Sequence, residues 1–138
     1  MERYLGKYSS YLYATLRVVA GVMFALHGMQ KLLGWPPGQG PRPPVGSMIW
    51  FSGLIELITG LLIAIGLFTG FAAFIASGEM AVAYFMAHHS ADKMLPILNG
   101  GELAVLYCFV FLYIASRGTV ICGVDTAVRW PGARSPAR

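Results

Sequence analysis

Hydrophobic residues gather into four long stretches, which are separated by segments rich in polar residues, glycine and proline. The stretches cover approximately residues 11–33, 48–66, 70–87 and 97–116. A predominantly apolar run of about 18 or more residues is typical of a membrane-spanning α-helix. The pattern therefore predicts an all-α membrane protein, in which residues 1–118 form a single antiparallel bundle of four transmembrane helices.

The chain must reverse direction between the second and third stretches. As one continuous helix, residues 48–87 would be about 60 Å long, twice the hydrocarbon thickness of about 30 Å. Gly66 and Gly70 bracket the only suitable breakpoint, so we expect a helical hairpin there. The proline- and glycine-rich residues 34–47 predict an outer aqueous loop, and Pro96 can begin the fourth helix.

Positive charges are distributed unevenly between the two sides that such a bundle defines. Four spans place both termini on one side, and residues 119–138 are expected to form a partly disordered tail there. That side carries Arg3, Lys7, Arg117, Arg129, Arg134 and Arg138, whereas the other carries Lys31, Arg42 and Lys93. The positive-inside rule then predicts that both termini are cytoplasmic.

Composition supports a membrane protein and argues against a nucleic-acid-binding one. Hydrophobic residues make up 57% of the chain and charged residues 12%, which leaves too little polar surface for a soluble domain. The net charge of +4 comes from tails and loops and matches an anionic lipid surface better than a nucleic acid.

Ionisable side chains interrupt the hydrophobic stretches, although a charge at the centre of a membrane helix costs at least about 2.5–3.5 kcal/mol. We therefore expect these groups to face one another inside the bundle. With a rise of about 1.5 Å per residue, Arg17 and Glu79 fall at similar depths, which predicts a charge pair. The same arithmetic gathers a second group in the outer half of the bilayer, namely His27, Glu56, Glu102 and, one turn beyond His27, Lys31.

Small residues lie on the same helix faces as these charges. Gly21 and Gly28 align with Arg17, and Ser52, Gly53 and Gly60 align with Glu56. Small residues let membrane helices approach closely, so we expect the four glycines to pack one helix against the next.

Three interpretations of the buried carboxylates remain open. The first is a set of structural ion pairs that holds the helices together in a scaffold or partner-binding protein. The second is a proton-exchanging site, in which His27, Glu56 and Glu102 surround a quinone head group or another small polar substrate. The third, a metal site, is disfavoured because the chain lacks the Glu-x-x-His pairs of di-metal bundles. Small-molecule or proton transport is a further alternative.

Several local motifs resemble those of the DoxX family of small bacterial four-helix membrane proteins. They are Arg17-Val-Val-Ala-Gly21 with Phe24, His27-Gly28 and Lys31-Leu32; Gly53-Leu-Ile-Glu56 with Gly60; Glu79-Met-Ala-Val-Ala-Tyr84; and Asn99-Gly-Gly-Glu102 with Leu106-Tyr107. The resemblance covers nearly all of the predicted membrane domain.

The resemblance implies a multi-pass protein of the bacterial cytoplasmic membrane, acting as an accessory subunit in quinone-linked or thiol and sulfur redox chemistry. Members of the family are associated with quinol oxidation and with thiosulfate:quinone oxidoreductase. A quinone is then the expected substrate or cofactor, and the expected partners are lipid, a redox protein and a second copy of the chain. Whether the chain itself is an enzyme stays open.

Overall fold

The computed structural model describes residues 2–38, 40–90 and 92–128, and these residues contain helices and no β-strand. The predicted all-helical class is therefore confirmed. In chain order the elements are α1 (Glu2–Leu5), a 3₁₀ turn (Gly6–Tyr8), α2 (Ser9–Leu33), α3 (Met48–Ile65), α4 (Thr69–Ala83), a π-helical turn (Tyr84–His88), α5 (Pro96–Asn99), α6 (Glu102–Arg117) and α7 (Val124–Ala127).

Among the residues that the structure describes, three helical segments are long and apolar enough to cross a membrane. They are Arg3–Leu33, Met48–Ile65 and Thr69–His88. The turn between the last two lies within the predicted breakpoint, because Gly66 ends α3 in the left-handed conformation with φ of +74°. The remaining long helix, α6, has 16 residues and a length of about 24 Å.

The structure differs from the prediction in the fourth stretch, where one helix over residues 97–116 was expected. The chain instead forms α5 and α6, which are separated at Gly100 and Gly101. Gly100 has φ of +72°, which is incompatible with a continuing right-handed helix. Gly101 lies against the ring of Tyr84, where an added Cβ would stand 2.6 Å from a ring carbon. This helix is therefore shorter than expected at its N-terminal end.

Helices α2 and α3 form a hairpin whose backbones are in direct contact. A Cβ at Gly21 would stand 2.7 Å from backbone atoms of Gly60 and Ala64. About two turns further along α2, Gly28 lies against the backbone of Gly53 and Leu57. Each helix thus carries two glycines, seven residues apart, on the face that contacts the other helix. Because glycine has no side chain, the two backbones can approach each other closely there.

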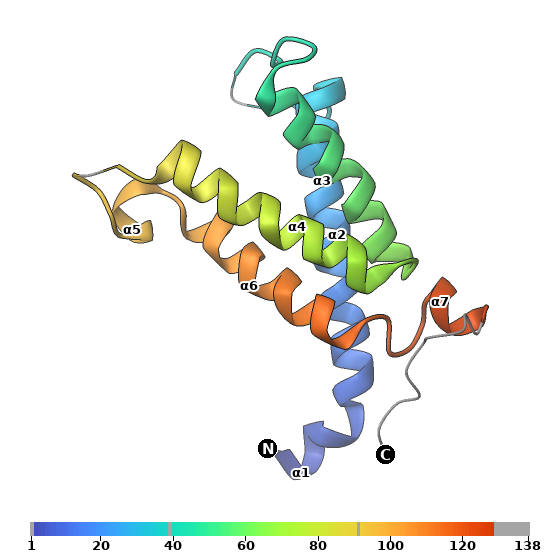
Figure 1. Ribbon diagram of the computed structural model, residues 1–138. Helices are drawn as coiled ribbons and strands as arrows, with labels where there is room; N and C mark the ends of the chain where they lie inside the picture. The colour runs from blue at the N-terminus through green and yellow to red at the C-terminus, as the bar shows by residue number, and fades with distance from the viewer. Residues whose placement is uncertain (1, 39, 91, 129–138) are drawn as a thin grey trace.

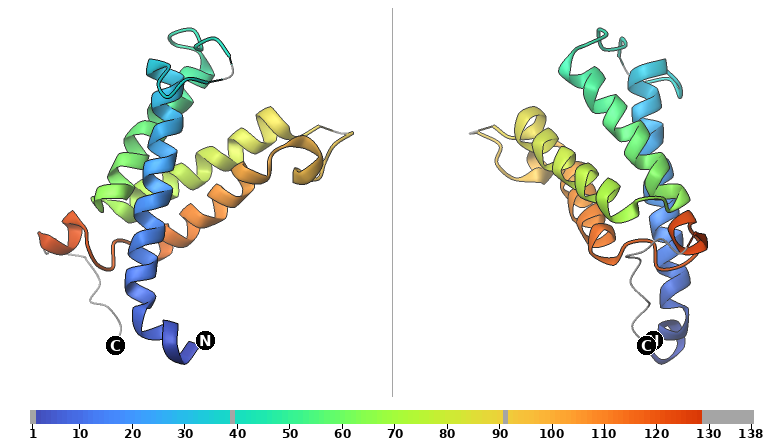
Figure 2. Two further views of the ribbon diagram at one scale, coloured as in Figure 1. Left: turned by 180° about the vertical axis from the view of Figure 1, so that it is seen from behind. Right: turned by 45° about the vertical axis from the view of Figure 1, so that its right-hand side comes forward.

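Helices α4 and α6 form a second hairpin that packs through alanines. Ala72, Ala73 and Ala76 of α4 are almost fully buried, as are Phe111 and Ile114 of α6. Figures 1 and 2 show that the two hairpins lie close together at the end that carries α7 and diverge towards α5 and the loop 34–47. The helices therefore do not run as one evenly packed bundle.

The segment after α6 is docked on the turn between α3 and α4. The carboxylate of Asp125 accepts hydrogen bonds from the backbone N–H groups of Phe68 (2.9 Å) and Thr69 (3.2 Å) at the start of α4. Thr119 donates to the same carboxylate at 2.7 Å. Part of the predicted tail thus has a defined position, and residues 129–138 lie outside the described residues.

Candidate functional site

A group of four polar side chains, which we call the carboxylate cluster, joins α2, α3 and α4. It consists of Lys31, Ser52, Glu56 and Glu79. The Lys31 ammonium group donates to Glu56 Oε1 at 2.7 Å and to Ser52 Oγ at 2.9 Å. The Ser52 hydroxyl in turn donates to Glu79 Oε1 at 2.6 Å. One lysine and one serine thus connect two carboxyl groups from different helices.

The local sequence explains how these side chains meet. Ser52 and Glu56 are four residues apart on α3, so they point to the same side of the helix. Gly53 leaves room for the stem of Lys31, because a Cβ at this glycine would stand 2.8 Å from the lysine Cβ. The glycine that permits close packing of α2 and α3 therefore also seats the lysine.

Three polar atoms of the site are buried and have no hydrogen-bond partner among the described residues. They are Glu56 Oε2, Glu79 Oε2 and the hydroxyl oxygen of Tyr107. Glu56 is only 3% exposed, and its carboxyl group interacts electrostatically with Glu79 and with Tyr107. Buried polar groups in proteins are nearly always paired, with protein or with ordered water, so these oxygens are positions where a water molecule or another polar group can bind.

The charges in the carboxylate cluster do not balance if both carboxyl groups are ionised. Lys31 supplies one positive charge, whereas Glu56 and Glu79 together would supply two negative charges. A net charge in a low-dielectric interior is costly, and one proton shared between the carboxyl groups makes the cluster neutral. The arrangement is thus suited to holding and releasing a proton.

Two other predicted site residues occupy different surroundings. His27 is half-buried, and its ring meets that of Tyr107 edge-on with 6.4 Å between centroids, which places it beside the cluster. Glu102 is exposed in the first turn of α6 and does not join it. The expected grouping of His27, Glu56 and Glu102 is therefore wrong for Glu102, because the break at Gly100 and the divergence of the hairpins carry it away.

The predicted pair between Arg17 and Glu79 is also wrong. Arg17 is fully buried and donates to the carbonyl oxygens of Ile63 and Ala64, in the last turn of α3, and to that of Cys122 at 2.7 Å. These carbonyls carry the partial negative charge of a helix C-terminus and of a tail segment. Glu79 instead accepts a hydrogen bond from the Ser52 hydroxyl.

Two residues of the site, Ser52 and Tyr107, were not predicted as functional. Ser52 was assigned only to close packing, although its position one turn before Glu56 could have indicated a hydrogen bond. Tyr107 was part of the family motif Leu106-Tyr107, but nothing in the sequence assigned it a role. Within the described residues, no group of three or more His, Cys, Asp or Glu side chains is placed to hold a metal ion.

Comparisons with known proteins give two matches. The model of the DoxX family matches residues 12–89, a range that contains all four members of the carboxylate cluster. An uncharacterized protein of Haemophilus influenzae is 46% identical over 125 residues, which cover 88% of this chain and 93% of the relative. No solved structure matches the chain.

Proposed function

The chain belongs to the DoxX family of membrane proteins, and from this premise we propose that it is an accessory subunit in quinone-linked or thiol and sulfur redox chemistry. In this proposal the carboxylate cluster is the proton-exchanging site. The membership confirms the resemblance that the sequence motifs indicated. The redox role itself is taken from the family, and the cluster supports it by supplying groups that can exchange the protons such chemistry needs.

The observation that carries the proposal is the unbalanced, incompletely paired state of the cluster. A purely structural ion pair would be expected to match its charges and to satisfy its oxygen atoms. Here two carboxyl groups share one lysine, and each keeps a buried oxygen without a partner among the described residues. Such a site favours proton exchange over a closed network that serves only assembly.

The chemistry assigned to the chain is limited to proton transfer. Reduction of a quinone to a quinol takes up two electrons and two protons. In the proposal the electrons come from a thiol or sulfur donor through a partner protein, and the protons pass through Glu56 and Glu79. Tyr107, whose hydroxyl is buried and unpaired within the described residues, supplies a further hydrogen-bond donor beside them.

The proposal includes a location and a topology. We place the chain in the bacterial cytoplasmic membrane, with the three long segments and α6 as four spans. Both termini are then cytoplasmic, and the carboxylate cluster lies in the outer half of the bilayer. Lipid contacts the exposed apolar faces, and a redox protein or a second copy of the chain completes the assembly.

The decisive experiment replaces the carboxyl groups one at a time in the organism that carries the gene. Membranes from a deletion strain complemented with Glu56→Gln or Glu79→Gln are expected to lose reduction of ubiquinone-1 by glutathione, sulfite or thiosulfate. Glu102→Gln removes an exposed carboxylate of the same type and is expected to retain it. Immunoblotting should show equal amounts of each variant in the membranes, so that a loss of quinone reduction cannot be attributed to misfolding.

Normal quinone reduction in both Glu56→Gln and Glu79→Gln would overturn the proposal. The cluster would then be a structural network, and the chain a membrane scaffold.

A further inference from the structure

The connection between α4 and α6 exposes a run of hydrophobic side chains. Residues 94–98 read Met-Leu-Pro-Ile-Leu, and each of the four large side chains in this run is at least 59% exposed. We call these five residues the α5 tip, because helix α5 begins within them, at the far end of the second hairpin from α7 (Figure 1). An exposed apolar patch of this kind marks a surface that contacts a protein or a membrane.

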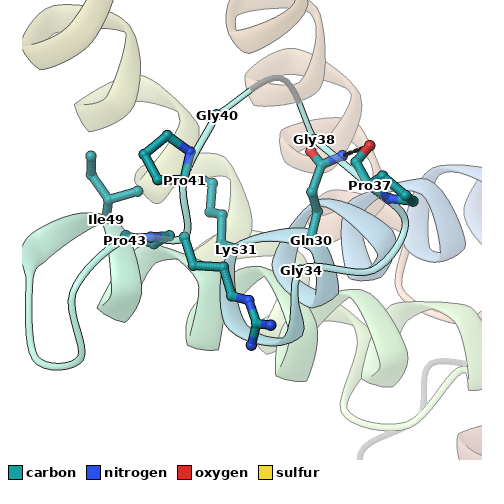
Figure 3. Close-up of a pocket in the computed structure, with 10 residues that line it drawn as sticks. Gln30, Lys31, Gly34, Pro37, Gly38, Gly40, Pro41, Pro43 and Ile49 are labelled. Atoms are coloured by element: carbon teal, nitrogen blue, oxygen red, sulfur yellow. Dashed lines mark hydrogen bonds between the residues drawn. The ribbon is translucent and has the colours of Figure 1, made fainter.

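The loop between α2 and α3 is of a different kind. Residues 34–47 contain five prolines, four glycines and the cation Arg42. Gln30, near the end of α2, donates to the carbonyl oxygens of Pro36 and Pro37 at 3.2 Å each (Figure 3). This polar composition is suited to water, so the apolar run of the α5 tip is not a general property of the connections in this chain.

The backbone of the α5 tip is hydrogen-bonded within the protein. The carbonyl oxygens of four consecutive residues, 93–96, each accept a hydrogen bond from the chain itself. The first two accept from the side chains of Asn99 at 3.0 Å and Tyr84 at 2.8 Å. The other two accept from the backbone N–H groups of Leu98 at 2.9 Å and Gly101 at 3.1 Å. A loop in water can leave its carbonyls to the solvent, whereas a loop in lipid needs internal partners for them.

The apolar surface of the α5 tip continues that of the second hairpin. Phe85 and Met86, near the end of the apolar segment Thr69–His88, are more than half exposed. Leu103 and Leu106 are exposed on α6. Exposed apolar faces of a membrane helix contact acyl chains, because the hydrocarbon core is as apolar as these side chains. The α5 tip is therefore an extension of a lipid-facing surface.

The second hairpin is also too short to carry its far end through a bilayer. Helix α6 is about 24 Å long, which is about 6 Å less than the hydrocarbon thickness of about 30 Å. Figures 1 and 2 show that α4 and α6 are inclined to α2, and an inclined helix spans even less of the membrane when α2 crosses it upright. With the docked tail at one membrane surface, the α5 tip lies at the level of the acyl chains.

We propose that the α5 tip is embedded in the bilayer and that its partner is the acyl-chain region of the phospholipids, in the leaflet nearest the loop 34–47. The four large apolar side chains contact acyl chains there, and Lys93, directly before the tip, extends its ammonium group to the head groups. An embedded tip holds the second hairpin inclined away from α2 and α3. This inference rests on the membrane location in the proposed function and not on the redox role.

The test measures the depth of the α5 tip with purified full-length protein in phosphatidylcholine nanodiscs. A bimane fluorophore is attached to Ile97→Cys in a background of Cys108→Ala and Cys122→Ala. Val45→Cys, an equally exposed apolar position in the loop 34–47, is the matched control. We expect phosphatidylcholine that is brominated in the upper half of an acyl chain to quench the label at Ile97→Cys. Aqueous iodide should quench it at least about fivefold less than the label at Val45→Cys, since an anion is excluded from hydrocarbon.

Two results would overturn the inference. Iodide quenching at Ile97→Cys equal to that at Val45→Cys would mean that the α5 tip lies in water, where a partner protein can reach it. Quenching by neither reagent would mean that protein covers the tip, either a second copy or another part of the chain. Leu98→Cys repeats the measurement at the neighbouring exposed side chain, so the result does not depend on one substitution.

A second set of variants tests whether the apolar side chains hold the tip in the membrane. With the label at Leu98→Cys, the double change Leu95→Ser and Ile97→Ser is expected to raise iodide quenching by about fivefold, because burial in the acyl chains depends on apolar area. Val45→Ser with the same label should leave the quenching unchanged. Retained protection in the double variant would contradict anchoring by these side chains.

The outcomes are independent of the test of the proposed function. An α5 tip that is open to iodide, together with loss of quinone reduction in Glu56→Gln and Glu79→Gln, would sink this inference and leave the proposed function standing. A tip quenched by brominated lipid, together with normal quinone reduction in both variants, would do the reverse.

Discussion

At the scale of single residues, the most deeply buried charge in the described part of the protein caps a helix. Arg17 is fully buried, and its guanidinium donates to two carbonyls in the last turn of α3 and to one in the segment before α7. The last four carbonyls of a helix have no partner within the helix, and a cation near them also interacts favourably with the helix dipole. Arg17 therefore secures both the end of α3 and the docked tail.

Replacing this side chain is expected to cost substantial stability. Arg17→Met keeps the hydrophobic stem and removes the donor from the carbonyls of Ala64 and Cys122, at about 1–3 kcal/mol for each that stays buried, whereas the Ile63 carbonyl keeps a hydrogen bond from the Gly66 N–H. Arg117→Met is the matched control, because that guanidinium lies over the ring of Tyr13, 5.4 Å from its centroid, and is exposed. A contact of this kind contributes about 0.5–1 kcal/mol. Unfolding in detergent micelles, followed by circular dichroism, measures the difference, and equal losses in the two variants would contradict the capping role.

The docked tail is expected to be sensitive to acid through Asp125. Partial burial raises the pKa of this carboxyl group, but hydrogen bonds from Thr119, Phe68 and Thr69 outweigh that effect and lower the pKa below its ordinary value. A lowered pKa in the folded state means that ionised Asp125 stabilises docking fully above about pH 4, the value for an unfolded aspartate, and that this contribution is lost at lower pH.

Hydrogen exchange at neutral pH tests this role. Asp125→Ala should speed exchange of the Phe68 and Thr69 amides, and Asp92→Ala, a change of an exposed loop carboxylate, should not. Unchanged protection in Asp125→Ala would show that the tail is held by other contacts.

These residues also show what could be predicted from the sequence. The burial of Arg17 and Glu56 and the half-buried position of Glu79 follow from the cost of charges in lipid. The partner of Arg17 does not follow from depth alone, because such an argument considers only other charges and neglects carbonyls at helix ends. The spacing of the glycines could have predicted the partner of Arg17. A register that aligns Gly21 with Gly60 also aligns Arg17 with Ala64, which lie one turn away from these glycines on their antiparallel helices.

At the scale of elements, the hairpin of α2 and α3 depends on positions where no side chain fits. Gly21, Gly28, Gly53 and Gly60 bring the two backbones into contact, and this contact sets the register that joins Lys31 to Glu56. The site is thus a consequence of helix packing. The break between α5 and α6 was harder to foresee, although the pair Gly100-Gly101 is a turn signal that could have indicated it.

Two glycine substitutions test the importance of this packing. Gly60→Ala places a Cβ against the backbone of Gly21 and Ala25, which cannot move without separating the helices. We expect a loss of about 1–3 kcal/mol in the free energy of unfolding. Gly78→Ala, in the middle of α4, meets nothing within 4 Å and should be neutral or stabilising by up to about 1 kcal/mol. Thermal unfolding of both variants in micelles gives the comparison, and a neutral Gly60→Ala would disprove the tight contact.

At the scale of the whole molecule, the two hairpins lie close together at the end that carries α7 (Figure 1) and are also connected through the carboxylate cluster. Arg17 and Asp125 join α3, α4 and the tail there, whereas the carboxylate cluster connects the half of α3 near its start to the half of α4 near its end, away from the turn between them. The sequence predicts the number of hydrophobic stretches but not the divergence of the hairpins, because hydropathy does not encode the angle between helices. The membrane topology depends on whether α6, which has 16 residues, crosses the bilayer.

The proposed topology predicts that Cys122 and the loop before α5 lie on opposite sides of the membrane. Cys122 is exposed after α6, and Lys93 is exposed before α5, so Lys93→Cys in a Cys108→Ala background provides the second label site. In intact spheroplasts a membrane-impermeant maleimide should label the thiol introduced by Lys93→Cys but not Cys122, and disruption of the membrane should expose both. If α6 did not cross the bilayer, the two thiols would lie on the same side and would be labelled together. Labelling of Cys122 alone in intact spheroplasts would mean that α6 crosses in the inverted orientation, with the loop between α2 and α3 facing the cytoplasm.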